Sequence, residues 1–227
     1  MLAVISCGSE EPERSEQPAP VAPAAPVAPV APVAPDAPVA PVAPVAPRIV
    51  VLGDSLTAGL GIPRDEAYPA VLQRKLKDAG MPLEVVNAGI SGDTTADGLR
   101  RLNWALEGDV RLLVVALGAN DGLRGLPPGQ MKANLQAIIH RARQRGIPVL
   151  LTGMEAPPNY GEQYASAFRQ VFQDLARENK VAFVPFLLDG VAGVPDLNQG
   201  DGIHPTAAGA SRIADHLWPA VKTMITK

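Results

Sequence analysis

Nine consecutive tripeptides of the form x-Ala-Pro occupy residues 21–47, and they limit most strongly what this chain can fold into. Proline fixes φ, has no backbone N–H and disfavours helix at the residue before it. A repeat with proline at every third position is therefore expected to be extended polyproline II. We interpret residues 8–47 as a disordered, proline-rich linker and expect one folded domain over residues 48–227.

The linker allows two interpretations. An extended polyproline II segment is a semi-rigid spacer, and the same repeat also creates P-x-x-P patterns that recognition domains can bind. We favour the spacer.

The N-terminal segment, residues 1–7, ends in Val-Ile-Ser-Cys, which resembles the lipobox of bacterial lipoproteins. There a signal peptide is cut before the cysteine, which then carries lipid. The apolar stretch is short for a signal peptide and has no positively charged start, so one interpretation is that the true start lies upstream. The alternative is a chance cysteine in a disordered N-terminus. We expect lipidation at Cys7 and a periplasmic, membrane-anchored protein.

Beyond the linker, short apolar runs alternate with segments of helical spacing. We predict strands over 48–52, 83–88, 111–117, 147–152 and 181–184. We predict helices over 67–79, 94–106, 127–145 (or from residue 129), 161–178 and 205–225. Short runs rich in β-branched residues are typical of strands that are buried on both faces. The alternation predicts an α/β fold with three α/β/α layers, built on a five-stranded, flavodoxin-like parallel sheet.

Composition excludes several classes of function. A net charge of -3 gives no basic field of the kind that nucleic acid binding needs. The basic cluster at 141–145 is better explained as the last turn of a helix, where cations suit the dipole. One cysteine allows no disulfide within the chain and no cysteine-based metal site. No apolar run approaches the length of a membrane span, and we expect no metal and no cofactor.

Polar segments follow the predicted strands at four places. They are Gly-Asp-Ser-Leu at 53–56, Gly-Ile-Ser-Gly-Asp-Thr at 89–94, Gly-Ala-Asn-Asp-Gly at 118–122 and Gly-Asp-Gly-Ile-His-Pro at 200–205. Open parallel sheets carry their chemistry outside the carboxyl ends of the strands. These four segments are therefore expected to meet at one edge of the sheet and to form the site.

A serine hydroxyl at this edge needs a neighbouring base, because it is a weak nucleophile at neutral pH. The chain has three histidines. His140 and His216 lie inside predicted helices and are expected to be surface or packing residues, which leaves His204. Asp201 lies three residues earlier and could orient the imidazole, although it could also be only a turn or N-cap residue.

Together the four segments resemble the SGNH (GDSL-type) hydrolases, and the resemblance covers nearly the whole predicted domain. It implies a catalytic set of Ser55 as nucleophile, His204 as base and Asp201 as its partner. It also implies an oxyanion hole formed by the backbone N–H groups of Ser55 and Gly92 and the side-chain amide of Asn120. A glycine at position 92 would allow close backbone approach.

Three segments narrow the resemblance to the bacterial multifunctional thioesterase I/lysophospholipase/arylesterase group: residues 90–94, 118–125 and 158–161. The resemblance implies hydrolysis of fatty acyl thioesters, lysophospholipids and aryl esters through an acyl-serine intermediate. We expect small-molecule substrates and a monomer. The apolar loops 122–128 and 154–161 would bind the acyl group, through Leu123, Pro158 and Tyr160.

Alternatives and supporting residues complete the prediction. A carbohydrate O-acetylesterase would use the same four segments, but the aromatic content of 4% is low for sugar stacking. A non-catalytic envelope lipoprotein would not need the complete Ser/Gly/Asn/Asp/His set. The sequence lacks G-x-S-x-G and the nucleotide-binding glycine motifs. We expect structural roles for Asp54 and Asp121, and an N-cap role for Asp93 at the helix that follows it.

Overall fold

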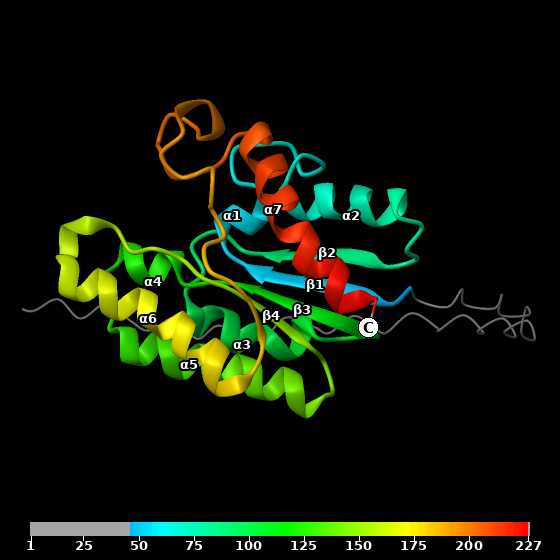
Figure 1. The fold of residues 1–227 in the computed structure, drawn as a ribbon, viewed down its shortest axis with the longest axis horizontal. Helices are drawn as coiled ribbons and strands as arrows, with labels where there is room; N and C mark the ends of the chain where they lie inside the picture. Colours follow the sequence, from blue (N-terminus) through cyan, green and yellow to red (C-terminus); the bar gives the residue numbers. More distant parts are fainter. Residues whose placement is uncertain (1–45, 227) are drawn as a thin grey trace, which may run out of the picture. The chain divides into compact units, whose positions relative to one another are not determined.

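The computed structural model describes residues 46–226, which contain a parallel sheet between two layers of helices (Figure 1). Its five strands lie in the order β2-β1-β3-β4-β5, and every neighbouring pair is parallel. The predicted three-layer, flavodoxin-like fold is confirmed. Cys7 and the proline-rich repeat up to residue 45 lie outside the described residues. The strands are β1 (Arg48–Gly53), β2 (Glu84–Gly89), β3 (Val110–Ala116), β4 (Val149–Thr152) and β5 (Ala182–Val184).

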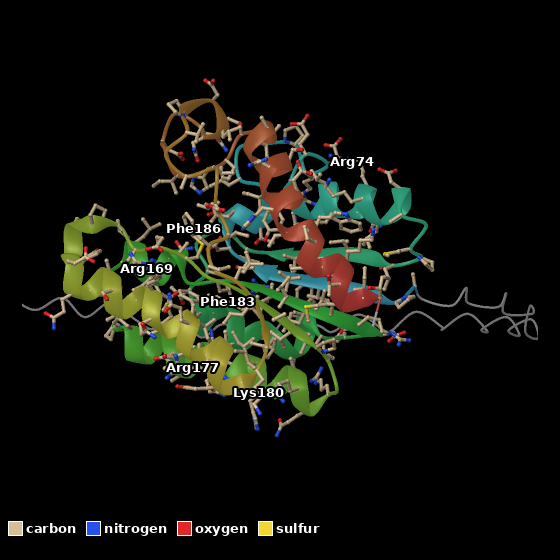
Figure 2. All side chains as sticks on the ribbon, viewed as in Figure 1. Arg74, Arg169, Arg177, Lys180, Phe183 and Phe186 are labelled. Atoms are coloured by element: carbon tan, nitrogen blue, oxygen red, sulfur yellow. The ribbon has the colours of Figure 1, made fainter. Side chains whose placement is uncertain are left out.

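Helices cover both faces of the sheet. Helices α2 (Tyr68–Asp78) and α7 (Ala207–Ile225) pack together on one face. On the other face lie α3 (Thr95–Ala105), α5 (Pro128–Gln144) and α6 (Glu162–Asn179). The apolar face of α6 buries Phe168 and Phe172, while charged side chains such as Arg177 are exposed (Figure 2). Within residues 46–226, no helix combines the length and apolar character needed to cross a membrane.

The central strands are buried on both faces, as their sequence predicts. Residues 49–52 of β1 are at most 1% exposed, and removing such apolar side chains from water is the main favourable contribution to folding. Arg141 and Arg143 lie in the last turn of α5, which confirms the interpretation of the basic cluster.

Strand register brings the polar segments to one level. Gly53 at the end of β1 pairs with Gly89 on β2 and with Ala116 on β3, so the chain leaves three neighbouring strands at one edge. A Cβ on Gly89 would lie 2.3 Å from the backbone nitrogen of Ala58. Only glycine therefore allows the turn after β1 to pack directly against the end of β2.

Four short elements were not predicted: α1 (Ser55–Ala58), α4 (Ala119–Leu123) and the 3₁₀ turns η1 (Pro158–Tyr160) and η2 (Pro195–Leu197). Elements of three to five residues are too short to show a hydrophobic period.

The prediction that Asp93 caps α3 is wrong. Thr94 is the N-cap and forms a capping box with Asp97, while the Asp93 carboxylate pairs with Arg101 instead.

Candidate active site

Ser55 is the first residue of α1, directly after β1. Asp54 is the N-cap of this helix, and its carboxylate accepts a hydrogen bond from the Leu56 N–H at 3.0 Å. The first N–H groups of a helix have no carbonyl partner within it. The Ser55 N–H is therefore not used by the helix and can serve a ligand.

His204 and Asp201 reach Ser55 from the long segment after β5. The Nε2 atom of His204 lies 2.9 Å from Ser55 Oγ, and its Nδ1 atom lies 2.6 Å from Asp201 Oδ2. The other oxygen of Asp201 accepts the backbone N–H groups of Ile203 and His204, at 2.9 and 3.0 Å. The structure thus brings the predicted Ser, His and Asp into one hydrogen-bonded chain.

The electrostatics of the hydrogen-bonded residues Ser55, His204 and Asp201 favour an imidazole that can act as a base. The hydrogen bond from the His204 side chain, followed by those from the two backbone N–H groups, holds the pKa of Asp201 well below its usual range. The carboxylate is therefore ionised and requires a donor, so Nδ1 carries the proton. The lone pair of Nε2 then faces the hydroxyl of Ser55 and can accept its proton.

Two amide side chains hold the loop that carries His204, and sequence reasoning missed both. Asn198 donates through Nδ2 to the carbonyl oxygen of Val194 at 2.8 Å. Gln199 donates from its backbone N–H to the His204 carbonyl at 2.7 Å and through Nε2 to the Leu60 carbonyl at 2.7 Å. An amide in a loop gives no periodic or motif signal, and only the nearness of Gln199 to Asp201 in the sequence could have suggested it.

The residues predicted to form an oxyanion hole lie on the segments that follow β1, β2 and β3. Asn120 is the second residue of α4, and its Nδ2 donates to the Asp93 carbonyl at 2.9 Å and approaches Asp54 Oδ2 at 3.5 Å. Gly92 has φ +86°, which an L-residue rarely adopts. Its carbonyl oxygen accepts a hydrogen bond from Arg124 at 2.8 Å.

Ser55, Asn120 and His204 share a cavity of about 450 Å³ with a largely apolar lining. The predicted substrate-binding residues Leu123 and Pro158 line this cavity, and Leu123 and Ile203 expose 42% and 44% of their surface. The structure does not bring Tyr160 into the cavity. Its hydroxyl donates to the Leu123 carbonyl at 3.0 Å, so it supports that loop from outside. The other apolar lining residues are Leu56, Ala119, Met154, Ala156, Pro157, Phe186, Leu188 and Ala192.

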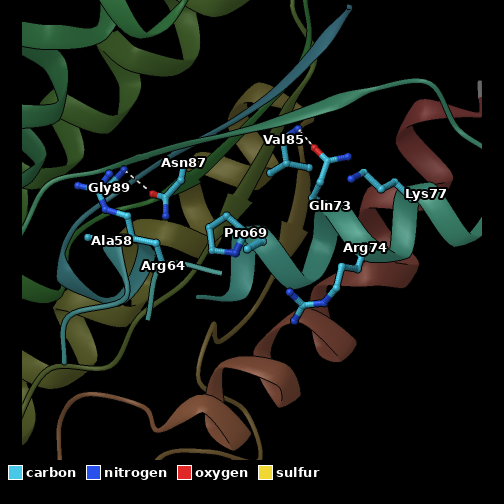
Figure 3. Close-up of a pocket in the computed structure, with 10 residues that line it drawn as sticks. Ala58, Arg64, Pro69, Gln73, Arg74, Lys77, Val85, Asn87 and Gly89 are labelled. Atoms are coloured by element: carbon cyan, nitrogen blue, oxygen red, sulfur yellow. Dashed lines mark hydrogen bonds between the residues drawn. The ribbon is translucent and has the colours of Figure 1, made fainter. Parts of the chain in front are cut away.

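A second cavity of about 470 Å³ lies between α2 and β2 (Figure 3). Arg64, Arg74 and Lys77 give it a basic lining. Its Gln73 amide is already used, because Oε1 accepts the Val85 N–H at 2.7 Å. None of the residues that line it is a serine, cysteine or histidine, whereas Ser55 and His204, the predicted nucleophile and base, both line the cavity of about 450 Å³.

Asp54 is a second buried carboxyl group beside the site. It is 1% exposed, and its burial raises the pKa from 3.8 to about 6, although the hydrogen bond from the Leu56 N–H opposes the shift. In the unfolded chain the pKa would be near the ordinary value. Between pH 3.8 and about 6 the folded state therefore binds more protons at this residue than the unfolded state.

The Asp54 carboxyl is expected to lower the stability of the fold as the pH rises through this window. A pKa shift of this size contributes at most about 3 kcal/mol to the free energy of unfolding. This contribution is present below pH 3.8 and lost above about pH 6. The free energy of unfolding of Asp54→Asn minus that of the wild type should therefore rise between pH 4 and 7. Urea denaturation of both proteins across this range measures the difference, and a difference independent of pH would contradict the prediction.

Residues 51–212 match the GDSL-like lipase/acylhydrolase family. Esterase TesA of Pseudomonas aeruginosa is 46% identical over 178 residues, which is 78% of this chain and 89% of the relative. Thioesterase 1/protease 1/lysophospholipase L1 of Escherichia coli K12 is 37% identical over 178 residues, which is 78% of this chain and 84% of the relative.

Solved structures agree with this assignment. A crystal structure of TesA superposes with a TM-score of 0.75 at 46% identity, covering 78% of this chain and 99% of that one. The resemblance to SGNH hydrolases is confirmed by sequence and by fold. The chain belongs to the GDSL-like lipase/acylhydrolase family and is a hydrolase of carboxylic esters or thioesters.

Proposed function

We propose that the chain cleaves acyl esters and thioesters through an acyl-serine intermediate on Ser55. One observation carries the proposal: the hydrogen-bonded chain Asp201–His204–Ser55 opens on an apolar cavity. A nucleophile with its base is the requirement for covalent acyl transfer, and an apolar wall beside it suits the hydrocarbon part of an acyl group.

The first half of the reaction transfers the acyl group to Ser55. As Oγ attacks the acyl carbon, His204 Nε2 accepts the hydroxyl proton, and ionised Asp201 stabilises the imidazolium. The carbonyl oxygen becomes an oxyanion. When the tetrahedral intermediate collapses, the bond to the leaving oxygen or sulfur breaks, and the leaving group takes the proton from His204. In the second half, His204 removes a proton from water, and the water oxygen attacks the acyl carbon. The bond to Ser55 Oγ then breaks, Oγ takes the proton back from His204, and the free acid leaves.

The oxyanion would accept hydrogen bonds from the backbone N–H groups of Ser55 and Gly92 and from Asn120 Nδ2. One hydrogen of the Asn120 amide is fixed by the Asp93 carbonyl at 2.9 Å. The other hydrogen faces Asp54 Oδ2, but the distance from Nδ2 to Oδ2 is 3.5 Å, so this contact is weak. That hydrogen is the one that can turn to a developing negative charge at little cost.

The acyl chain would lie along Leu123, Met154 and Pro158. Burial of each methylene group contributes about 0.8 kcal/mol, so the cavity should favour medium and long acyl chains over acetyl. We propose fatty acyl thioesters, lysophospholipids and aryl esters as substrates, which agrees with the thioesterase and lysophospholipase activities in the name of the Escherichia coli relative.

The location of the protein stays a proposal from its sequence. Lipidation at Cys7 and the spacer up to residue 47 would hold the domain near a membrane in the periplasm. Cytosolic acyl-CoA could not be the natural substrate there, and lysophospholipids or other envelope esters are better candidates. The monomeric state remains a prediction as well.

A chain-length series tests the substrate class. We expect kcat/KM with p-nitrophenyl esters to rise from acetyl to medium or long chains. Leu123→Ala should lower the values for long chains several-fold and leave acetyl nearly unchanged, because it removes apolar surface from the cavity. Trp104→Ala, an exposed apolar residue on α3, is the matched control. Activity on acetyl esters alone would indicate an O-acetylesterase, and no activity on any ester would contradict the proposal.

A further inference from the structure

Arg101 on α3 contacts two of the segments that form the site. Its Nε atom lies 2.6 Å from Asp93 Oδ2, and its Nη2 atom donates to the Gly53 carbonyl at 2.8 Å. The ion pair is largely buried: 14% of the Arg101 side chain and 12% of the Asp93 side chain are exposed. One guanidinium therefore links the end of β1 to the segment after β2.

These contacts lie next to all three proposed oxyanion donors. Gly53 is two residues before Ser55, and Asp93 directly follows Gly92. The carbonyl oxygen of Asp93 also accepts the side-chain amide of Asn120 at 2.9 Å.

The Gly53 carbonyl accepts a second hydrogen bond, from the Ile90 N–H at 3.1 Å. The segments after β1 and β2 are thus joined at the same point that the guanidinium reaches, and Asn120 joins the third segment through Asp93. The hydrogen bonds of Arg101 are therefore connected to the segments that carry all three proposed donors.

Stability alone is a poor explanation for this placement. Burying an ion pair carries a desolvation cost that its attraction often does not exceed. Among the described residues, no group accepts a hydrogen bond from the buried Nη1 atom of Arg101. The two atoms that do bond, Nε and Nη2, both act on segments of the site.

We propose that Arg101 is a positioning residue that fixes the relative places of the three oxyanion donors. The proposal rests on the proposed function, because it assigns Arg101 to the same oxyanion hole. The guanidinium is suited to this task since its planar fork reaches two acceptors in fixed directions, which a lysine ammonium cannot reproduce. A misplacement of catalytic groups by 1 Å can cost about 10²-fold in rate.

The test compares Arg101→Lys with Arg100→Lys, its neighbour on α3, whose side chain is 75% exposed and pairs with Asp97. With p-nitrophenyl butyrate, Arg101→Lys should lower kcat about 30- to 100-fold and leave KM within about threefold. An alkyl trifluoromethyl ketone, which forms a tetrahedral oxyanion adduct with a serine, should bind more weakly by the same factor as kcat/KM falls. Arg100→Lys should change neither value.

A second variant separates positioning from folding. Asp93→Asn/Arg101→Met removes both buried charges and keeps the Asp93 backbone carbonyl that Asn120 uses. Circular dichroism and Tm would show that each variant is folded at the assay temperature, and this double variant should lose kcat and adduct affinity as Arg101→Lys does.

Three results would overturn the proposal: folded variants with kcat within threefold of the wild type, a loss confined to KM with unchanged adduct affinity, or failure of both variants to fold. None of these results would affect the proposed function, whose own failure would appear as wild-type activity that does not depend on Ser55.

Discussion

Alanine at Ser55 or at His204 is expected to lower kcat by roughly 10⁴- to 10⁶-fold, with little change in substrate binding. In the proposed mechanism both residues act on one proton, across the 2.9 Å between Nε2 and Oγ, so the two losses should be similar and far from additive. Steady-state kinetics with p-nitrophenyl butyrate measure the effect.

The control for these variants is His140→Ala, because His140 is an exposed residue of α5. It should keep wild-type kcat. Asp201→Ala should lose less than His204→Ala, since the imidazole remains present but loses the hydrogen bond at 2.6 Å that orients it. A Ser55→Ala protein as active as the wild type would show that the nucleophile has been assigned wrongly.

Alanine at Asn120 should lower kcat by about 10²- to 10³-fold, equivalent to roughly 2.7–4 kcal/mol of transition-state stabilisation. The amide can donate to the oxyanion but has no comparable partner in the ground-state ester, so KM should change little. The variant also leaves the Asp93 carbonyl without its 2.9 Å donor, and Tm should therefore be measured beside kcat.

The matched control for Asn120→Ala is Asn103→Ala, an exposed asparagine on α3. It loses the hydrogen bond from Arg145 at 3.0 Å, which involves no residue of the proposed site, so its kcat should stay within twofold. If Asn120→Ala raised KM and left kcat unchanged, Asn120 would bind the substrate rather than the oxyanion.

The fold could be predicted from the sequence because its strands are buried on both faces. Residues 49–52 and 112–115 are continuous apolar runs, and both lie within strands at the centre of the sheet. The polar segments after β1, β2 and β3 could be placed at one edge because the carboxyl ends of parallel strands lie at the same edge of a sheet.

The parts that could not be predicted depend on tertiary contacts. In the sequence, Arg101 is one of several charged residues in a predicted helix. Only the packing of α3 brings it to Gly53 and Asp93. Asn198 and Gln199 act through backbone carbonyls of the loop, which no side-chain pattern reveals. Tyr160 was predicted to bind substrate from its apolar loop, but its hydroxyl is held by Leu123.

The central claim is that Ser55 carries the acyl group, and covalent labelling tests it most directly. A p-nitrophenyl alkylphosphonate should react with one residue per chain, release one p-nitrophenolate and abolish activity, because it leaves a stable tetrahedral group on the nucleophile. Peptide mass spectrometry should then find the phosphonyl mass on Ser55, and the His204→Ala protein should react far more slowly. A label on any other residue, or complete inactivation with Ser55 unmodified, would contradict the account.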